Sequence, residues 1–298
     1  MCGRYASARS RIELLEEFAV ERDRVDEPLN PDYNVAPTKP VYAVMTRAPR
    51  ADRAEQVDDQ AASQQTASQQ TASQQAGPQP AVQQPAVQQQ AVQQQARPQR
   101  ELRIVRWGLV PFWAKDTAIG SRLINARAET VSEKPAFRAA FAKRRCLLPA
   151  DGYFEWQAPP AGSKGKKQPY FICRPDHGPL AFAGLYELWR DRSAQADDQA
   201  AWLWTTTIIT TSAPDELGEI HDRMPMVIDP ASWTDWLDPV NTDVADLRAL
   251  LAPAQTTGLI NYPVATLVNS VRNNGPELIE QADAIPVAPG LAGGWSDH

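Results

Sequence analysis

Cysteine and histidine are scarce in this chain of 298 residues, which holds three of each. The cysteines, Cys2, Cys146 and Cys173, form no CxxC pair, and any pairing would leave one thiol over. A disulfide framework and a structural zinc site both need cysteines in closely spaced sets, so we expect neither. The histidines have no carboxylates at ligand spacing, so we expect no metal ion and no other cofactor.

Long hydrophobic runs are also missing. No stretch approaches the roughly 18 consecutive apolar residues that span a bilayer, and the chain does not begin with a basic segment followed by an apolar run. The sequence therefore predicts a protein without a secretory signal or membrane contact, located in the reducing cytoplasm.

Positive charge is in the minority, because the formal net charge is -6 at pH 7. Taken alone, this balance speaks against a surface coated with positive charge for tight binding of nucleic acid. We interpret two basic clusters, "KRR" at 143–145 and "KGKK" at 164–167, as a solvated face and a loop tip. Composition alone does not decide whether nucleic acid is a partner.

Large apolar residues are nearly absent from residues 51–100, where repeats such as "TASQQTASQQ" and "AVQQQAVQQQ" dominate. Such a segment cannot bury enough apolar surface to offset the entropy lost on ordering. We therefore expect a disordered Gln/Ala-rich insertion at 51–100. The rest of the chain is long enough for a single domain over 2–286, followed by a C-terminal tail at 287–298.

Outside the insertion, strand-like runs alternate with short helical segments. Residues 7–18 combine a serine cap with apolar residues at helical spacing, which predicts a first helix. β-Branched and aromatic runs predict strands at 41–46, 102–110, 122–130, 146–156, 169–174, 180–189 and 202–211. Further short helices are expected at 133–144, 213–220, 231–238 and 242–251. The strands are too closely spaced for βαβ units, so we expect an α+β fold with a compact mixed or antiparallel sheet, or a barrel-like core, and short peripheral helices.

Four polar residues stand in positions where chemistry is conceivable. His221, in "EIHDRMPM", follows a short amphipathic helix, although a lone histidine is more often structural. Glu155, in "DGYFEW", is either an ordinary solvent-facing carboxylate or one with a raised pKa in an aromatic-lined cleft. Asn125, in a strand-like run, needs hydrogen-bond partners and serves either the structure or a substrate. Asn34, ahead of Pro37, is typical of a turn.

Cys2 is the most informative position. A small second residue permits removal of Met1, after which Cys2 carries an α-amine and a thiol on adjacent carbons. Their unperturbed pKa values, about 8 and about 8.5, make both groups partly nucleophilic near neutrality. With an aldehyde, the amine forms an imine and the thiol then closes on the imine carbon to give a five-membered thiazolidine ring. Cysteine at position 2 also occurs by chance, so this chemistry needs support from the rest of the chain.

Nine motifs along the chain supply that support. In order they are "MCGRY", "YNVAPT", "RWGLVPFWAKD", "LINARAET", "LLPADGYFEW", "QPYFI", "AFAGLYELW", "IHDRMPMVI" and a late "YPV…VN…PELIE". Together they closely resemble the SRAP (SOS response-associated peptidase) family over about residues 2–50 and 101–281. The resemblance skips the insertion and the tail.

The resemblance implies a sensor and shield of abasic sites in single-stranded DNA. Members of this family use the mature N-terminal cysteine for a covalent thiazolidine crosslink to the ring-opened sugar, which is lyase-like Schiff-base chemistry. Autocatalytic N-terminal processing and reversal of the crosslink are further implied activities. The implied partners are single-stranded DNA with abasic sites and replication-fork proteins, for a monomer associated with the nucleoid.

The family's functional residues carry over by motif. Cys2 would supply the amine and the thiol, Glu155 would hold the amine and exchange protons with it, and His221 would protonate the sugar oxygen. Asn125 would orient Cys2 and the sugar. The positions implied to lie against the DNA are Thr210, which helps place the sugar ring, Arg4, Arg127 and Arg223 at phosphates, and Trp107 and Trp113 as apolar wedges beside the lesion.

Three other interpretations stay open at this level. "MCG" also opens glutamine-dependent amidotransferases, so an N-terminal-cysteine amidohydrolase is one alternative. A thiol peptidase with Cys2 and His221 as nucleophile and base is another. The third is an adaptor without enzymatic activity whose insertion at 51–100 binds a replication partner.

Overall fold

The structure is a computed structural model that describes residues 2–47, 97–160, 163, 165–195, 198–251 and 258–285. Described residues up to Thr46 and from Arg100 onward belong to one compact unit. Most of the expected insertion and all of the expected tail at 287–298 lie outside the described residues. Gln99 and Arg100, which the composition assigned to the insertion, are the first residues of a strand.

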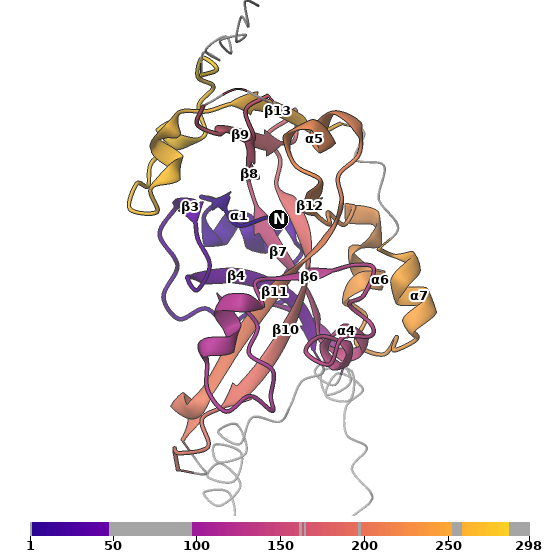
Figure 1. Cartoon of the computed structure of the whole chain (residues 1–298). Coiled ribbons are helices and arrows are strands. Elements are labelled where there is room, and N and C mark those ends of the chain that lie inside the picture. The colour runs from indigo at the N-terminus through magenta and orange to yellow at the C-terminus, as the bar shows by residue number, and fades with distance from the viewer. Residues whose placement is uncertain are drawn as a thin grey trace, which may run out of the picture. The chain divides into compact units, whose positions relative to one another are not determined.

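A closed barrel of five strands forms the centre of this unit (Figure 1). Neighbouring strands pair around the ring, and a parallel pairing between the first and last members closes it. The strands in ring order are β11 (Trp202–Ser212), β10 (Leu180–Arg190), β7 (Arg145–Ala150), β4 (Pro40–Arg47) and β5 (Gln99–Trp107). The α+β fold with a barrel-like core is therefore confirmed.

Three short strands extend the barrel. They are β2 (Arg22–Asp23), which pairs with β5, and β6 (Asn125–Arg127) and β12 (Arg223–Pro225), which both pair with β11. The strand expected at 122–130 is thus confined to three residues. Its second half turns back on itself, since the amides of Thr130 and Glu133 donate to the carbonyls of Arg127 and Thr130.

A second sheet of five strands carries the start of the chain. Its order is β13 (Ile260–Pro263), β9 (Gln168–Cys173), β8 (Gly152–Gln157), β1 (Tyr5–Ser7) and β3 (Asp32–Val35). Strand β1 therefore lies inside the sheet, with antiparallel partners on both sides. An interior strand is held by two ladders of hydrogen bonds, so the residues just before it have a defined place.

The helices are short and peripheral. Helix α1 (Arg11–Glu17) begins with a capping box, in which Ser10 accepts from the Glu13 amide and the Glu13 carboxylate accepts from the Ser10 amide. The other α-helices are α4 (Arg138–Lys143), α5 (Asp215–Ile220), α6 (Trp233–Leu237) and α7 (Val244–Ala249). The 3-10 helices are η1 (Ala118–Arg122), η2 (Gln199–Ala201), η3 (Pro230–Ser232), η4 (Thr266–Asn269) and η5 (Pro276–Leu278).

Alternate residues of the barrel strands enter two separate hydrophobic cores, as the period-2 geometry of strands requires. Residues such as Val44 and Leu147 face outward and pack with the helices, including Phe141 of α4 and Trp236 of α6. Residues of the opposite set fill the barrel interior, and Cys2, Tyr5 and Tyr153 of the second sheet join them. The Tyr5 ring contacts Trp107 and Phe182 edge-on, with centroids 5.3 and 5.7 Å apart. These contacts fix the start of the chain against the barrel.

In the part of the chain that the structure describes, no helix is both long enough and apolar enough to span a membrane.

Candidate active site at the chain start

The start of the chain runs alongside β8. Tyr5 pairs with Tyr153, and the Phe154 amide donates a hydrogen bond of 3.0 Å to the Arg4 carbonyl. The antiparallel course continues toward Glu155, so Cys2 and Glu155 come close together. In Figure 1 the start of the chain, marked N, lies between the labels of β8 and β12.

The thiol of Cys2 is fully buried. Burial raises its pKa well above the ordinary value, and the negative charge of Glu155 raises it further. Its only short polar contact among the described residues is with the Arg4 carbonyl, 3.9 Å from Sγ. The thiol is therefore protonated at neutral pH.

Asn125 holds the main chain of Cys2. It stands at the start of β6, which pairs with the barrel strand β11 in register Asn125–Ile208. Its Nδ2 donates a hydrogen bond of 2.8 Å to the Cys2 carbonyl. Its Oδ1 is buried and has no hydrogen-bond partner among the described residues. Buried polar atoms rarely lack a partner, so this oxygen is available to a ligand.

Glu155 is buried, with 4% of its surface exposed, although it stands on a strand between two aromatic residues. Burial raises its pKa to about 7, and the negative charge of Asp222 acts in the same direction. The side chain is therefore not the solvent-facing carboxylate that was one of two alternatives from the sequence. A carboxyl group with this pKa can both accept and donate a proton at neutral pH.

His221 follows α5 directly and is partly exposed. Burial lowers its pKa, which favours the neutral ring. The Arg223 amide donates to Nδ1 at 3.0 Å, so the neutral ring carries its proton on Nε2. Nδ1 is also 2.9 Å from Asp222 Oδ1, a contact that would stabilise the protonated ring. The chain start, β8 and the α5–β12 connection thus bring together a thiol, a carboxyl group and an imidazole ring.

The guanidinium of Arg223 is engaged within the protein. It binds Glu129 through two hydrogen bonds of 2.6 and 3.1 Å and donates to the Thr210 carbonyl at 2.6 Å. Thr210 is fully buried, and its hydroxyl lies 3.3 Å from the same guanidinium. In this structure the Thr210 side chain is enclosed and contacts Arg223, and its implied place beside the sugar stays a prediction.

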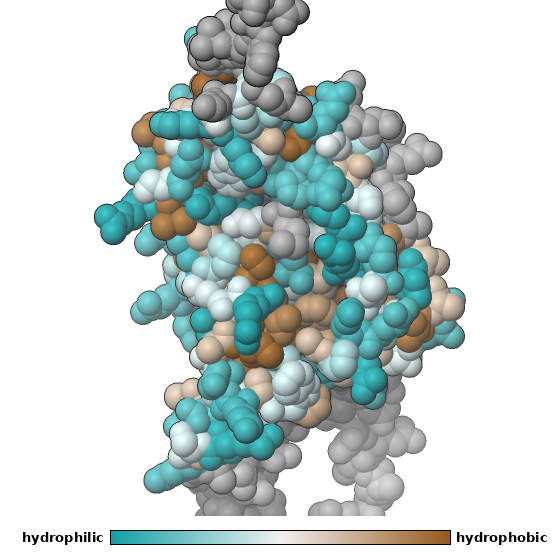
Figure 2. Space-filling model, viewed as in Figure 1, coloured by the Kyte–Doolittle hydropathy of each residue, from teal (hydrophilic) through white to brown (hydrophobic). Residues whose placement is uncertain are grey.

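Two of the other predicted DNA contacts also differ in exposure. Trp107 is fully buried and its Nε1 donates to the Ile124 carbonyl at 2.9 Å, so it does not present apolar surface in this structure, and its implied role as a wedge stays a prediction. Trp113 is 46% exposed and can do so, as can its neighbour Phe112, which is 56% exposed and was not singled out from the sequence. Figure 2 shows hydrophobic side chains, in brown, on this face among hydrophilic ones.

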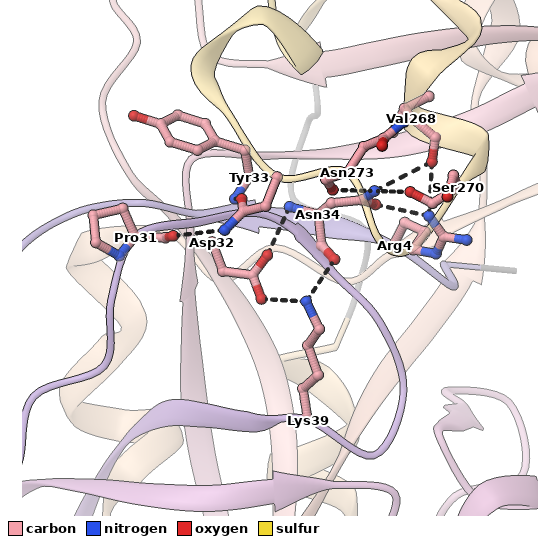
Figure 3. A network of polar contacts seen from close by, with 10 residues as sticks. Arg4, Pro31, Asp32, Tyr33, Asn34, Lys39, Val268, Ser270 and Asn273 are labelled. Carbon is pink, nitrogen blue, oxygen red and sulfur yellow. Dashed lines mark hydrogen bonds and ion pairs between the residues drawn. The ribbon is translucent and has the colours of Figure 1, made fainter.

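The arginines expected at phosphates lie in different surroundings. Arg127 is exposed at the end of β6. Arg4 is half-buried, and its Nη1 donates to Asn34 Oδ1 at 2.7 Å and to the Val268 carbonyl at 2.8 Å (Figure 3). Asn34, interpreted from the sequence as a turn residue, is in fact a fully buried strand residue.

Lys167 is a further cation at the site that the sequence did not single out. It belongs to the basic cluster at 164–167 and stands one residue before β9, the antiparallel neighbour of β8. Its charge lowers the pKa of both Glu155 and His221, which places it within electrostatic reach of both. Within the described ranges, no group of three or more His, Cys, Asp or Glu side chains is arranged to hold a metal ion.

Comparison with known proteins gives one consistent result. The model of the family "SOS response associated peptidase (SRAP)" matches residues 1–271. "Abasic site processing protein YoqW" of Bacillus subtilis is 33% identical over 280 residues, which is 94% of this chain and 99% of that protein. The chicken protein "Abasic site processing protein HMCES" is 32% identical over 204 residues, 61% of this chain and 57% of that protein.

Solved structures agree with this result. A crystal structure of a protein from Bacteroides thetaiotaomicron has 32% sequence identity and a TM-score of 0.54, covering 61% of this chain and 77% of that one. A Bordetella bronchiseptica protein has the same fold at 22% identity, with a TM-score of 0.57 over 89% of this chain and all of that one. With the family model matching most of its length and a buried cysteine at position 2, the chain belongs to the SRAP family.

Proposed function

We propose that this protein processes abasic sites in DNA, and that it senses and shields them in single-stranded DNA through a covalent thiazolidine crosslink at Cys2. The observation that carries the proposal is the pairing of a chain-start cysteine, held by Asn125, with a buried carboxyl group whose pKa is about 7. The names of the relatives in Bacillus subtilis and chicken support DNA with abasic sites as the target. The chemistry requires removal of Met1, which frees the α-amine of Cys2.

The first step opens the abasic sugar. In its closed form the sugar hides the aldehyde as a hemiacetal, so a base must take the proton of the C1′ hydroxyl while an acid protonates the ring oxygen. Glu155 in its ionised form is the base, and His221 in its protonated form, which the contact with Asp222 stabilises, is the acid. The unpaired Asn125 Oδ1 accepts a hydrogen bond from a sugar hydroxyl.

The amine of Cys2 reacts before its thiol. Because burial keeps the thiol protonated, the neutral α-amine is the better nucleophile at pH 7. It adds to the aldehyde carbon, and Glu155 returns the proton it took from the C1′ hydroxyl to the departing hydroxyl group, so loss of water leaves an iminium ion and an ionised Glu155. The sulfur then bonds to the same carbon as its proton passes to Glu155, which closes a neutral thiazolidine. Overall, one aldehyde and one aminothiol give one ring and one water, and the reverse sequence releases the DNA.

The exposed residues around the site would bind the DNA strand. Arg127 and Lys167 are the cations best placed to bind phosphates, and Arg4 and Arg223 add positive charge behind them. Trp113 and Phe112 provide apolar surface against bases next to the lesion. An abasic nucleotide has no base to unstack, so exposing it costs little.

The raised pKa of the Cys2 thiol also weighs against the hydrolase alternatives. An amidohydrolase or a general thiol peptidase uses a thiolate nucleophile, which this buried site disfavours. Peptidase activity would then be limited to the chain's own N-terminus, where removal of Met1 prepares the site.

Intact-mass measurement tests the proposal directly. The purified protein is mixed with a single-stranded oligonucleotide that carries one abasic site, and a second sample receives the tetrahydrofuran analogue, which has no aldehyde. We expect the protein to lose Met1 and to gain the mass of the oligonucleotide less one water, only with the true abasic site. Cys2→Ala should form no heat-stable adduct, and Cys2→Ser only a weaker, reductant-trappable imine. A full-yield stable adduct with Cys2→Ala would refute the proposal.

A further inference from the structure

The side chain of Asn34 forms hydrogen bonds both with Arg4 near the start of the chain and with residues 268–273 (Figure 3). It stands on β3 with no exposed surface. Its Oδ1 accepts from Arg4, two residues after Cys2, at 2.7 Å. Its Nδ2 donates toward three carbonyls of the segment that follows β13, those of Val268, Ser270 and Asn273, at 3.3, 2.9 and 3.1 Å.

The same segment contacts the residues that lead into β1 and a residue of β8, which lie next to the proposed reacting groups. Arg4 donates to the Val268 carbonyl at 2.8 Å, and its guanidinium lies 5.8 Å from the ring centroid of Trp156. Trp156 follows Glu155 directly, and its Nε1 donates to Asn269 Oδ1 at 2.6 Å. Residues 268–273, which we call the C-terminal clamp, therefore bind one neighbour of Cys2 and one neighbour of Glu155.

The backbone of Asn34 is also held in place by hydrogen bonds. Its backbone amide donates a hydrogen bond to Asp32 Oδ1 at 2.9 Å, and its backbone carbonyl accepts one from Lys39 Nζ at 3.2 Å. Lys39 and Asp32 form an ion pair of 2.6 Å (Figure 3). A side-chain amide with a fixed backbone and four side-chain bonds has one orientation, so it can transmit position from β3 to Arg4.

We propose that Asn34 is a positioning residue for the crosslinking reaction, and that it acts through Arg4 and the C-terminal clamp to hold Cys2 at the required distance from Glu155. The inference rests on the proposed function of Cys2. Asn34 touches none of the reacting atoms. A misplacement of a nucleophile by about 1 Å can cost roughly 100-fold in rate, so a support of this kind is catalytically significant.

The test compares Asn34→Ala and Asn34→Asp with the control Asn30→Ala, an exposed asparagine that precedes the same strand. Single-turnover crosslinking at saturating abasic oligonucleotide gives the rate, and binding of the tetrahydrofuran analogue gives the non-covalent affinity. We expect Asn34→Ala to slow crosslinking at least 10-fold with affinity changed less than 2-fold. We expect Asn34→Asp, which keeps the oxygen facing Arg4 but loses the donors to the clamp, to have an intermediate rate, and Asn30→Ala to match the wild type.

Hydrogen exchange without DNA provides a second measurement that does not depend on crosslinking. Asn34→Ala should speed amide exchange in residues 3–7 and 268–273, and Asn34→Asp mainly in 268–273, whereas Asn30→Ala should change neither. Asn34→Asp keeps the side-chain volume and serves if Asn34→Ala does not fold. Wild-type exchange in both segments, or wild-type crosslinking by folded Asn34 variants, would overturn the inference. Absence of any adduct with the wild-type protein would instead refute the proposed function, and the exchange data would still decide whether Asn34 orders the chain start.

Discussion

The side-chain nitrogen of Asn125 donates a hydrogen bond of 2.8 Å to the carbonyl oxygen of Cys2. It joins the first residues of the chain to a strand more than a hundred positions away, which is itself paired to the barrel. The proposed nucleophile is thereby held by a strand that pairs with the barrel and not by a loop.

Replacing this donor tests its importance. Asn125→Asp keeps the side-chain size but places an oxygen against the Cys2 carbonyl. We expect crosslinking to slow by about 10-fold or more, a factor that corresponds to the free energy of about one hydrogen bond. The rate is measured in single turnover with an abasic oligonucleotide. Asn30→Asp, an exposed change of the same chemistry, should react like the wild type. Equal rates for the two variants would show that the bond to Cys2 has no kinetic role.

The pH dependence of crosslinking follows from Glu155. Its pKa is raised to about 7, and the proposed base must be ionised, so the rate should rise with pH up to about 7, above which the loss of the protonated form of His221, whose pKa is lowered, opposes the rise. Glu155→Gln should lower the rate by roughly 100-fold and remove this rise. The rise that remains should follow the α-amine, with a midpoint near 8. A profile of Glu155→Gln that keeps the midpoint near 7 would assign that titration to another group.

The ionised form of Glu155 should also lower the free energy of unfolding. Its pKa is raised from 4.5 to about 7, which corresponds to about 3 kcal/mol of unfolding free energy. An acid with a raised pKa is harder to ionise in the folded state, so stability falls as the pH rises from 4.5 to 7. Glu155→Gln should therefore be more stable than the wild type at pH 8, by up to about 3 kcal/mol, and little different at pH 4. Urea denaturation at both pH values measures this, with exposed Glu277→Gln as the control. A Glu155→Gln variant that is less stable at pH 8 would contradict the burial penalty.

The two internal histidines provide a matched comparison. His221→Ala should slow crosslinking by roughly 100-fold, because the acid that protonates the sugar oxygen is lost. His177→Ala should leave the rate unchanged, since that side chain is exposed in the turn between β9 and β10. An oligonucleotide with the sugar already opened should restore part of the rate to His221→Ala. If the opened substrate gives no recovery, the role of His221 lies after ring opening.

Salt dependence identifies a direct phosphate contact. Arg127 is exposed beside Asn125, and we expect Arg127→Gln to weaken binding of the tetrahydrofuran analogue and to reduce the slope of log K against log salt by about 0.7, as for one phosphate on a single strand. Arg248→Gln, an exposed change on α7, should alter neither. An unchanged slope for Arg127→Gln would exclude this contact.

The fold was predictable where local rules decide. β-Branched and aromatic runs predicted the barrel strands, and a serine cap followed by apolar residues at helical spacing predicted α1, which the structure shows to begin with a capping box. Closure of the barrel was not predictable, because the parallel pairing of Arg106 with Thr205 joins strands that are far apart in sequence. Local patterns carry no information about such a pairing.

Burial was harder to predict than secondary structure. Both faces of the barrel strands are covered, one by the interior cluster and one by the helices, so the sequence pattern did not reveal that Trp107 is buried. Asn34 was missed for another reason. The turn signal of the following proline was local, whereas three of its hydrogen-bond partners lie 234 to 239 positions further along. Cys2, by contrast, was identifiable from its place next to the initiator methionine.

The enclosure of the Cys2 sulfur has a chemical consequence beyond the order of bond formation. Peroxides and alkylating agents attack exposed thiolates, and this sulfur is neither exposed nor ionised. If Cys2 reacts as proposed, its burial would protect the sulfur from peroxides and alkylating agents until an aldehyde enters the site.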